Sequence, residues 1–498
     1  MRKEIDMTKK LLSMALAVVM TLQLFACVRS DPSGQEPSPG VPADASAPAE
    51  PETAAPETEP EYPPLPEADL DGFTLRISNM EPSSMSWANI AILTEQDGTP
   101  VNDAIFQRNV ELEETYNCVL NETLQADRST GYITNAVAAG SDDFDVCMVY
   151  DISAAEVVSS MLDWNLLSGP DYSRPWWNPD ATGMFAIDGK LYYTAGNMTL
   201  GYLSRAMCYL VNRNLYADLG LEENLYELVR GGKWTQDRFL AMAVRGVMDT
   251  DGDGRFTAGD TYGVFGNPRA FLNTLMGGAG ISYVERDETG SFVFRMSGNE
   301  AAVNLLQDAV RFMSANPNLY YNEGNVPYEL IPDTLFSTGQ ALFHVQGLPH
   351  TIAQLREMED DFGILPLPKR DESQSSYYAP SYGAALSGIP KTVPADRYEN
   401  LGLLLEAMTR RTQETVVPQY KEVLLKNKLT RDEDSADMLD IIFGSIVFDP
   451  GIVLWCGDIS DSICADLFMK RNDAVVSYLE KKTPAFQKLI DAFNAAVS

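Results

Sequence analysis

An acidic loop over residues 249–260 carries the most specific chemistry in this sequence. It places aspartates at positions 1, 3, 5 and 12 and a glycine, Gly254, at position 6, which is the pattern of a calcium-binding loop. A Ca²⁺ ion takes about six to eight oxygen ligands, and the glycine permits the sharp turn that points those oxygens inward. The predicted ligands are the carboxylates of Asp249, Asp251, Asp253 and Asp260 and the main-chain carbonyl of Arg255.

Position 12 of this loop departs from the EF-hand pattern, because Asp260 replaces the longer glutamate that binds calcium bidentately. A metal-free acidic turn is the alternative. We favour calcium because closely spaced carboxylates repel one another unless a cation lies among them. The sequence after the loop, TYGVFGNP, has the character of a strand and a turn, so we expect no EF-hand helix pair. The ion would be structural and would hold the preceding helix to the next strand.

The composition restricts the partners of the protein. A chain of 498 residues is too long for one compact core, so two lobes or domains are expected. The formal net charge of −34 argues against nucleic acid as a partner, because phosphates need a basic surface. The same charge disfavours an anionic membrane surface as the main partner. Neutral ligands, and cations such as calcium, remain.

The first residues have the features of an export signal. Two lysines precede an apolar run over residues 11–25, which is short for a bilayer-spanning helix, and Cys27 follows it. The segment LFAC resembles a bacterial lipobox, so we predict a signal peptide over residues 1–27 and lipidation of Cys27. Two acidic residues before Met7 are unusual in such a signal, and translation from Met7 is an open alternative.

A polar segment over residues 28–68 follows the predicted signal. It is rich in proline, alanine and glutamate and has almost nothing to bury, which is typical of a disordered tether. Together with a lipid on Cys27, the tether predicts a protein anchored at the extracellular face of the cell membrane. Its contact with the membrane would be through the lipid alone.

The sequence offers little for other metals or for known catalytic motifs. The cysteines after Cys27 are odd in number and lack close spacing, which argues against a disulfide framework. Without a C-x-x-C pair and with only two histidines, a zinc site is not expected. The chain has no G-x-S-x-G elbow, P-loop, dinucleotide fingerprint or H-E-x-x-H motif, so no motif identifies an enzyme.

Strands alternate with helices from Phe73 onward. FTLRIS alternates like a first strand, and VNDAIFQRNVELEETYNC has the spacing of an amphipathic helix. The apolar run over residues 144–151 reads as a strand closed by a carboxylate. Repetition of this order implies βαβ units around a mostly parallel sheet, and therefore an α/β fold.

The order of several segments makes the chain similar to a known family from Phe73 to Phe493. VNDAIFQRN lies near the start, GKWTQDRF leads into DTDGDG and DTYG, and LFSTGQALF, FGILPLPK and LWCGDI follow. In this order they resemble bacterial extracellular solute-binding lipoproteins of the sugar-type class (family 1) that serve ABC importers. The resemblance implies a two-lobed periplasmic-binding-protein-like fold with hinge strands and an interlobe cleft. It also implies a monomer that delivers a small-molecule carbohydrate to an ABC permease in the membrane.

The resemblance implies lobe boundaries as well. The family's crossovers match strands near residues 208–212 and 386–390 of this sequence, with a later crossover near 430–450. The predicted first lobe is 69–208 plus 388–430, and the second, which contains the calcium-type loop, is 212–385 plus 431–498.

A carbohydrate site needs aromatic rings for the apolar sugar faces and polar groups for the hydroxyls. Trp176 and Trp177 are candidates because two adjacent tryptophans in a polar, proline-bracketed segment are not expected to point into one core; burial is the alternative for each. Asp151 closes an apolar strand, where it reaches a ligand hydroxyl or, alternatively, caps the next helix. The resemblance implies Trp455, a late aromatic on the second lobe's side of the cleft. The predicted substrate-binding residues are Trp176, Trp177, Trp455, Asp151, Tyr193, Tyr382 and Gln346.

Three of these candidates follow from their positions: Tyr193, Tyr382 before Gly383, and Gln346 in HVQGLPH. Tyr193 alternates with a neighbouring tyrosine, so one of the two rings faces inward and the other can face the cleft. Many members of the family carry an aromatic residue just after the glycine that Gly347 matches, but Leu348 stands there in this sequence. Trp164 and Trp234 are expected in the core.

The sequence favours a binding protein over two alternatives. A secreted carbohydrate-active enzyme needs only a pair of carboxylates, which the 71 acidic residues could supply. The same lobes could also serve a membrane sensor, or bind a solute other than a sugar. The sequence does not name the sugar, because aromatic stacking tolerates many of them.

Overall fold

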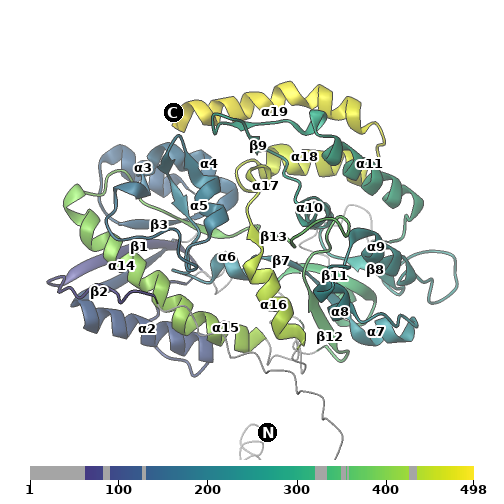
Figure 1. The fold of residues 1–498 in the computed structure, drawn as a ribbon, viewed down its shortest axis with the longest axis horizontal. Coiled ribbons are helices and arrows are strands. Elements are labelled where there is room, and N and C mark those ends of the chain that lie inside the picture. Colours follow the sequence, from purple (N-terminus) through teal and green to yellow (C-terminus); the bar gives the residue numbers. More distant parts are fainter. Residues whose placement is uncertain are drawn as a thin grey trace, which may run out of the picture. The chain divides into compact units, whose positions relative to one another are not determined.

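Two β-sheets, one in each of two lobes, organise residues 64–498 (Figure 1). The predicted signal peptide, Cys27 and most of the predicted tether lie outside the residues that the structure describes. None of the described helices is both long and apolar enough to cross a membrane. The computed structural model describes residues 62–81, 90–125, 130–319, 334–348, 355, 358–424 and 434–497.

The first sheet has five strands in the order β2–β1–β3–β14–β6. β1 pairs in parallel with β2 and β3, whereas β14 runs antiparallel to β3 and β6. β1 and β3 are mostly buried, as expected for apolar strands inside a sheet, and both predicted strands are confirmed. The strands are β1 (Phe73–Met80), β2 (Cys118–Gln125), β3 (Val146–Tyr150), β6 (Tyr193–Thr194) and β14 (Ala385–Gly388).

Helices α2, α14 and α15 pack together beside this sheet (Figure 1). α2 has a proline in its first turn, where the missing N–H is not needed, and it ends where Asn117 adopts a left-handed φ of 49°. Its buried Ile105, Leu112 and Tyr116 lie on one face, which confirms the predicted amphipathic helix. The helices of this lobe are α2 (Pro100–Tyr116), α3 (Gly131–Ala139), α4 (Ala154–Val157), α5 (Pro179–Phe185), α14 (Tyr398–Arg411) and α15 (Val417–Leu424), and the short α6 (Gly201–Ser204) precedes β7 of the second sheet.

The second sheet has four strands in the order β12–β7–β11–β8. β7 runs antiparallel to both β11 and β12, and β8 is parallel to β11. Every residue of β7 is buried, which explains its continuous apolar sequence. The strands are β7 (Met207–Asn212), β8 (Tyr262–Phe265), β11 (Ala341–Gly347) and β12 (Phe362–Leu365). Short strands elsewhere are β4 (Ala186–Ile187), β5 (Lys190–Leu191), β9 (Glu285–Arg286), β10 (Phe292–Val293), β13 (Ala379–Pro380) and β15 (Ile446–Val447).

An aromatic cluster lies between the second sheet and its helices. The ring of Phe239 lies 4.4 Å from that of Tyr209 and 5.0 Å from that of Phe343, between centroids. Trp234 joins this cluster, and both Trp234 and Trp164 are fully buried, as predicted. The helices of this lobe are α7 (Arg213–Asp218), α8 (Leu225–Arg230), α9 (Gln236–Arg245), α10 (Pro268–Gly278), α11 (Glu300–Ala315), α12 (Thr334–Ser337), α16 (Asp434–Gly444), α17 (Pro450–Val453), α18 (Asp461–Ile463) and α19 (Val475–Val497).

The chain passes between the two sheets at more than one place. It leaves the first sheet after β6 and enters the second at β7, and it returns between β12 and β14. Ala206 and Ser381 form a β-bridge between these two crossing segments. The predicted crossovers at residues 208–212 and 386–390 therefore fall within or just beyond β7 and β14, a few residues after the crossing segments. The later crossover, predicted near residues 430–450, lies outside the described part up to residue 433; from residue 434 the chain forms helix α16 (Asp434–Gly444), which packs against β12 of the second sheet.

A buried carboxylate fastens the returning chain to the first sheet. Asp145 lies directly before β3, and its side chain has no exposed surface. It accepts hydrogen bonds from Arg76 Nη2 at 2.9 Å and from Arg397 Nε at 2.7 Å. Burial alone would raise the pKa of Asp145, but the hydrogen bonds from Arg76 and Arg397 outweigh it and hold that pKa below its usual value. Because Arg397 directly precedes α14, this contact fixes the start of that helix.

We predict that Asp145→Asn lowers the free energy of unfolding by about 3 kcal/mol, because it leaves two guanidinium groups without their carboxylate. Asp142 lies 3.9 Å from Arg76 and is exposed, so the control Asp142→Asn should cost less than about 1 kcal/mol. The lowered pKa means that Asp145 stabilises the fold above its unfolded pKa of about 4, and that this contribution is lost at lower pH. Urea unfolding near neutral and acidic pH measures both effects; equal losses for the two variants near pH 7 would contradict the prediction.

Candidate functional site

A cavity of about 590 Å³ lies between the two lobes. The segment after β3 forms its first-lobe side, and Tyr382 comes from the returning crossing segment. The start of α10, the segment after α17 and one face of α19 form the rest. The polar lining residues are Ser153, Glu156, Arg269, Tyr382, Cys456, Asp458 and Asp461, and the apolar ones include Ile152, Ala155, Leu454, Trp455, Leu489, Ala492, Phe493 and Ala496.

Both lobes contribute chain segments that follow the carboxyl end of a strand. β3 ends at Tyr150, and the lining begins at Ile152. In the second lobe β8 ends at Phe265, and Asn267 caps α10 by accepting the main-chain N–H of Arg269 at 2.9 Å. Loops at the carboxyl ends of strands are where open α/β sheets place their ligands. The cavity therefore lies where the topology predicts a binding site.

Trp455 has the largest aromatic ring among the residues that line the cavity, and it is a predicted ligand contact; only 5% of the residue is exposed, so a small part of the indole reaches the cavity. It packs edge to face against Phe292 and Phe493, with ring centroids 5.5 Å and 5.3 Å away. α17 ends shortly before Trp455. Its N-cap residue, Asp449, accepts the main-chain N–H of Tyr283 at 2.8 Å. The indole is thus held by its neighbours in one orientation.

An ion pair and a thiol supply polar groups to the wall. Arg269 Nη1 lies 2.9 Å from Asp461 Oδ2, and the sulfur of Cys456 lies 3.6 Å from both the Tyr382 hydroxyl and Asp461 Oδ1. Burial raises the pKa of Cys456 to about 11, so the thiol stays protonated and can donate a hydrogen bond. Burial also raises the pKa of Asp461, although Arg269 opposes this shift. The wall offers both donors and acceptors to a ligand.

Sequence reasoning missed this ion pair. Arg269 and Asp461 are far apart in the sequence, and no spacing pattern connects them. The one available signal was the Asn267–Pro268 helix start immediately after β8, because polar groups of a ligand site gather where a strand gives way to a helix. Nothing in the sequence pattern indicated that α19 lines the cavity.

Trp176 and Trp177 lie inside the first lobe and do not line the cavity. Their exposed fractions are 3% and 2%. Their indole nitrogens donate to the two carboxylate oxygens of Glu406 in α14, at 2.9 Å and 2.7 Å. The expectation that adjacent tryptophans cannot both enter one core is wrong here, because a single carboxylate accepts hydrogen bonds from both indoles. Burial raises the pKa of Glu406, and these hydrogen bonds oppose that shift.

The other predicted aromatic residues divide between interior and cavity. Tyr193 is 1% exposed, and its hydroxyl donates to the Ala154 carbonyl at 2.7 Å inside the first lobe. Tyr382 does line the cavity. Gln346 belongs to β11, but its side chain is outside the described part of the structure.

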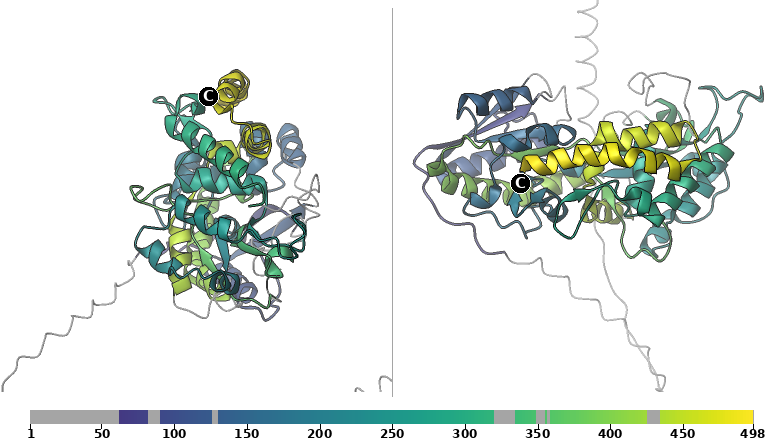
Figure 2. Two further views of the ribbon diagram at one scale, coloured as in Figure 1. Left: turned by 90° about the vertical axis from the view of Figure 1, so that its right-hand side faces the viewer. Right: turned by 90° about the horizontal axis from the view of Figure 1, so that it is seen from above.

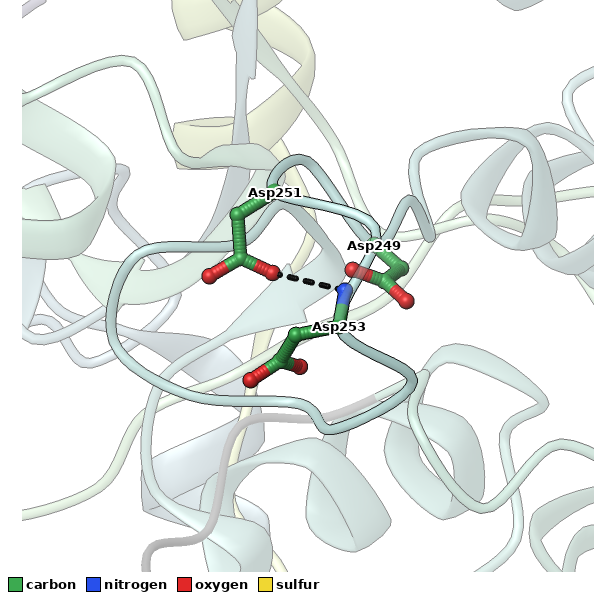
Figure 3. A group of neighbouring side chains, drawn as sticks. All are labelled: Asp249, Asp251 and Asp253. Carbon is green, nitrogen blue, oxygen red and sulfur yellow. Dashed lines mark hydrogen bonds between the residues drawn. The ribbon is translucent and has the colours of Figure 1, made fainter.

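The acidic loop lies between α9 and β8 in the second lobe (Figure 3). Carboxylate oxygens of Asp249, Asp251 and Asp253 come within 4.8 Å of one another. Asp249 accepts the main-chain N–H groups of Gly252 and Gly254 at 2.7 Å and 2.8 Å, and Asp251 accepts that of Asp253 at 3.1 Å. Three carboxylates at this spacing form a donor set that suits a calcium ion. The segment after the loop is a strand, as predicted.

Asp260 stands apart from these three carboxylates. It is fully buried, and it accepts main-chain N–H groups from Thr250 at 2.8 Å and from Thr257 at 2.7 Å. The hydrogen bonds from Thr257 and Thr250 lower the pKa of Asp260. The structure does not bring the predicted ligand at position 12 together with the other three, because the group of carboxylate oxygens within 4.8 Å of one another contains Asp249, Asp251 and Asp253 and not Asp260. Arg255 donates its main-chain N–H to Asp253 at 2.7 Å.

Asp151 lies where the first sheet, the returning chain and the cavity meet. Oδ2 accepts the main-chain N–H groups of Gly383 at 2.9 Å and Ala384 at 3.0 Å, and Oδ1 accepts that of Ile152 at 2.7 Å. Gly383 has a φ of +78°, and a Cβ there would lie 3.0 Å from the Tyr150 hydroxyl, so the turn requires glycine. Asp151 is fully buried and does not line the cavity. Its predicted contact with a ligand is replaced by a contact with the crossing segment.

We predict that Asp151 makes stability depend on pH. Burial raises its pKa to about 7, although main-chain hydrogen bonds from Ala384, Ile152 and Gly383 oppose this shift. Its unfolded pKa is about 4, so its contribution is present below about pH 4 and is lost as the pH rises to 7. The free energy of unfolding of the wild type should therefore fall relative to Asp151→Asn over this range, by about 1.4 kcal/mol per unit of separation between the two pKa values.

Chemical denaturation of both proteins at several pH values between roughly 4 and 8 tests this sign. Asp449, whose pKa burial also raises to about 7, is present in both proteins, so its effect cancels in the comparison. A difference between the two proteins that stays constant with pH would show that Asp151 does not titrate in this window.

Solved structures of other proteins share the two-lobed arrangement. UspC of M. tuberculosis aligns with a TM-score of 0.52 at 15% identity, covering 85% of this chain and 100% of that chain. The galacto-N-biose-/lacto-N-biose I-binding protein of the ABC transporter from Bifidobacterium longum, in complex with lacto-N-biose, aligns with a TM-score of 0.52 at 14% identity, covering 85% and 98%. The cyclic alpha-maltosyl-1,6-maltose binding protein from Arthrobacter globiformis aligns with a TM-score of 0.51 at 13% identity, covering 85% and 99%.

At these identities the likeness concerns the fold alone. No family model matches the sequence, and no curated protein matches it. The chain therefore has the two-lobed α/β fold of solute-binding proteins, which confirms the fold class predicted from its sequence.

Proposed function

We propose that the protein is an extracellular lipoprotein that binds an oligosaccharide between its lobes and delivers it to an ABC permease. The observation that carries this proposal is the indole of Trp455 beside the donors and acceptors of Arg269, Asp461 and Tyr382 in one interlobe cavity. A sugar ring would stack its C–H face on the indole while its hydroxyls bond to the polar wall.

The dimensions of the cavity support a small-molecule ligand. Its volume of about 590 Å³ falls within the range of roughly 300–1,000 Å³ that ligand pockets occupy. Because both lobes contribute lining residues, a bound ligand contacts both and favours the arrangement in which they are close together. That coupling between ligand and lobe position is what a permease needs to distinguish loaded protein from empty protein.

The solved structures support a sugar as the ligand class. The Bifidobacterium protein belongs to an ABC transporter and holds lacto-N-biose, and the Arthrobacter protein is named for a cyclic maltosyl-maltose. The predicted lipobox at Cys27 supports anchoring at the outer face of the membrane, and the acidic, proline-rich segment after it supports a tether. The permease follows from the resemblance of the sequence to binding proteins of importers.

A thermal-shift panel of maltotetraose, lacto-N-biose, β-1,6-galactobiose, cellotetraose and xylotetraose tests ligand binding. At least one sugar should raise the melting temperature, because a ligand that binds only the folded state stabilises it. Trp455→Leu should weaken that binding at least tenfold by removing the stacking ring, whereas Trp455→Phe, which keeps a ring, should retain most of it. Calorimetry gives the affinities, and circular dichroism checks that each variant is folded.

Chromatography of the same mixtures separates binding from catalysis. A binding protein leaves every sugar intact, so release of shorter sugars at enzyme-like rates would overturn the proposal. Absence of any thermal shift across the panel would also count against a sugar ligand.

We also propose that the acidic loop binds a structural Ca²⁺ ion through Asp249, Asp251 and Asp253. The closeness of their carboxylates supports this, since such a cluster is repulsive without a cation. Asp260 would act from outside the cluster by holding the main chain of the loop through Thr250 and Thr257.

Removal of calcium should lower the melting temperature of the wild type. At a free calcium concentration about 100 times the dissociation constant, the ion would contribute about 2.7 kcal/mol. Asp251→Ala should remove the sensitivity to chelator. The control Asp308→Ala should keep it, because it changes an aspartate in α11 that is 68% exposed and lies outside the acidic loop. A wild-type melting temperature that is the same in EDTA and in calcium would point to the metal-free acidic turn.

A further inference from the structure

One face of α19 is part of the cavity wall. Leu489, Ala492, Phe493 and Ala496 all line the cavity, and their spacing places them on a single stripe of the helix. Leu489 is 38% exposed, and the two alanines are exposed as well. Leu489 and the two alanines therefore present an exposed apolar surface to the cavity, whereas Phe493 is buried and packs against Phe292 and Trp455.

α19 also connects the two lobes (Figures 1 and 2). In the second lobe, Asn494 Nδ2 donates to the Phe292 carbonyl at 2.9 Å, and Gln487 Oε1 accepts the Phe294 N–H at 2.9 Å. At its far end the carbonyl of Val497 accepts a hydrogen bond from the Tyr192 hydroxyl of the first lobe at 3.0 Å. The helix thus holds its position over the cavity by contacts on both sides of it.

The α19 stripe and the polar wall divide the cavity chemically. Phe493 packs against Trp455 with ring centroids 5.3 Å apart, so the apolar stripe continues into the indole. Arg269 and Asp461 supply the hydrogen-bonding groups of the same cavity. A pyranose has this same division, with apolar C–H faces and a rim of hydroxyls.

We propose that α19 determines which sugars the site accepts. The apolar face of a bound sugar lies against Trp455 and the α19 stripe, and its hydroxyls point to the polar wall. Ala492 and Ala496 are small, and the space that they leave sets how far the sugar chain extends beneath the helix. This inference rests on the proposed function, because it assigns specificity within the same site.

The test compares two tryptophan substitutions on one helix. Ala492→Trp puts an indole into the cavity, and Ala495→Trp puts the same side chain on an exposed alanine of α19 that does not line the cavity. Both positions are exposed, so both variants should fold, which melting curves check. Calorimetry then measures binding of the panel sugar that shifts the wild-type melting temperature most, together with the other four sugars.

We expect Ala492→Trp to lose at least tenfold in affinity for that sugar, and to lose more for tetrasaccharides than for disaccharides. Ala495→Trp should keep the wild-type affinity within about twofold, or roughly 0.4 kcal/mol. Equal affinity of Ala492→Trp and wild type would overturn the role of α19 and leave the proposed function standing. Failure of the wild type to bind any sugar of the panel would overturn the proposed function, and this inference with it.

Discussion

The burial of one carboxylate, Asp151, is the constraint on which the arrangement of the two lobes depends. A buried carboxylate is costly unless hydrogen bonds compensate it, and main-chain N–H groups on both sides of the junction compensate part of the cost of burying this one. Two of those groups belong to the chain that returns from the second lobe, at Gly383 and Ala384. The third belongs to Ile152, the first residue of the cavity wall. The side chain of Asp151, directly after β3, therefore holds both the returning segment and the first residue of the cavity wall in place.

The site follows from this junction and from the topology of the two sheets. Each lobe places a loop at the carboxyl end of its strands, and the bridge between Ala206 and Ser381 brings the two crossing segments together. This arrangement brings together side chains that are far apart in the sequence, such as Arg269 and Asp461. The cavity is divided into an apolar stripe and a polar wall because different elements supply them: α19 supplies the apolar stripe, and α10 supplies Arg269 to the polar wall.

Local sequence patterns predicted the strands and helices that depend on neighbouring residues. They missed the side-chain positions that depend on partners far away in the sequence. The strand at Phe73, the helix that follows it and the buried strand before Asp151 were readable from periodicity. Trp176 and Trp177 were misread because their partner, Glu406, is remote in the sequence and takes both indole N–H groups. Asp260 fits a ligand pattern by spacing, yet it is not part of the carboxylate group that Asp249, Asp251 and Asp253 form. Trp455 was identified through a resemblance to a family, and no local pattern identified α19.

The hydrogen bond between Tyr192 and Val497 has a kinetic consequence. α19 has 23 residues and so is about 35 Å long, and the carbonyls of its last turn have no partners within the helix. Because Tyr192 of the other lobe donates to one of them, any separation of the two lobes must break this hydrogen bond. Under the proposed function, the rate at which a ligand escapes would then depend in part on how often the last turn of α19 lets go of Tyr192. The residence time of the ligand would thus be sensitive to a contact that the ligand does not touch.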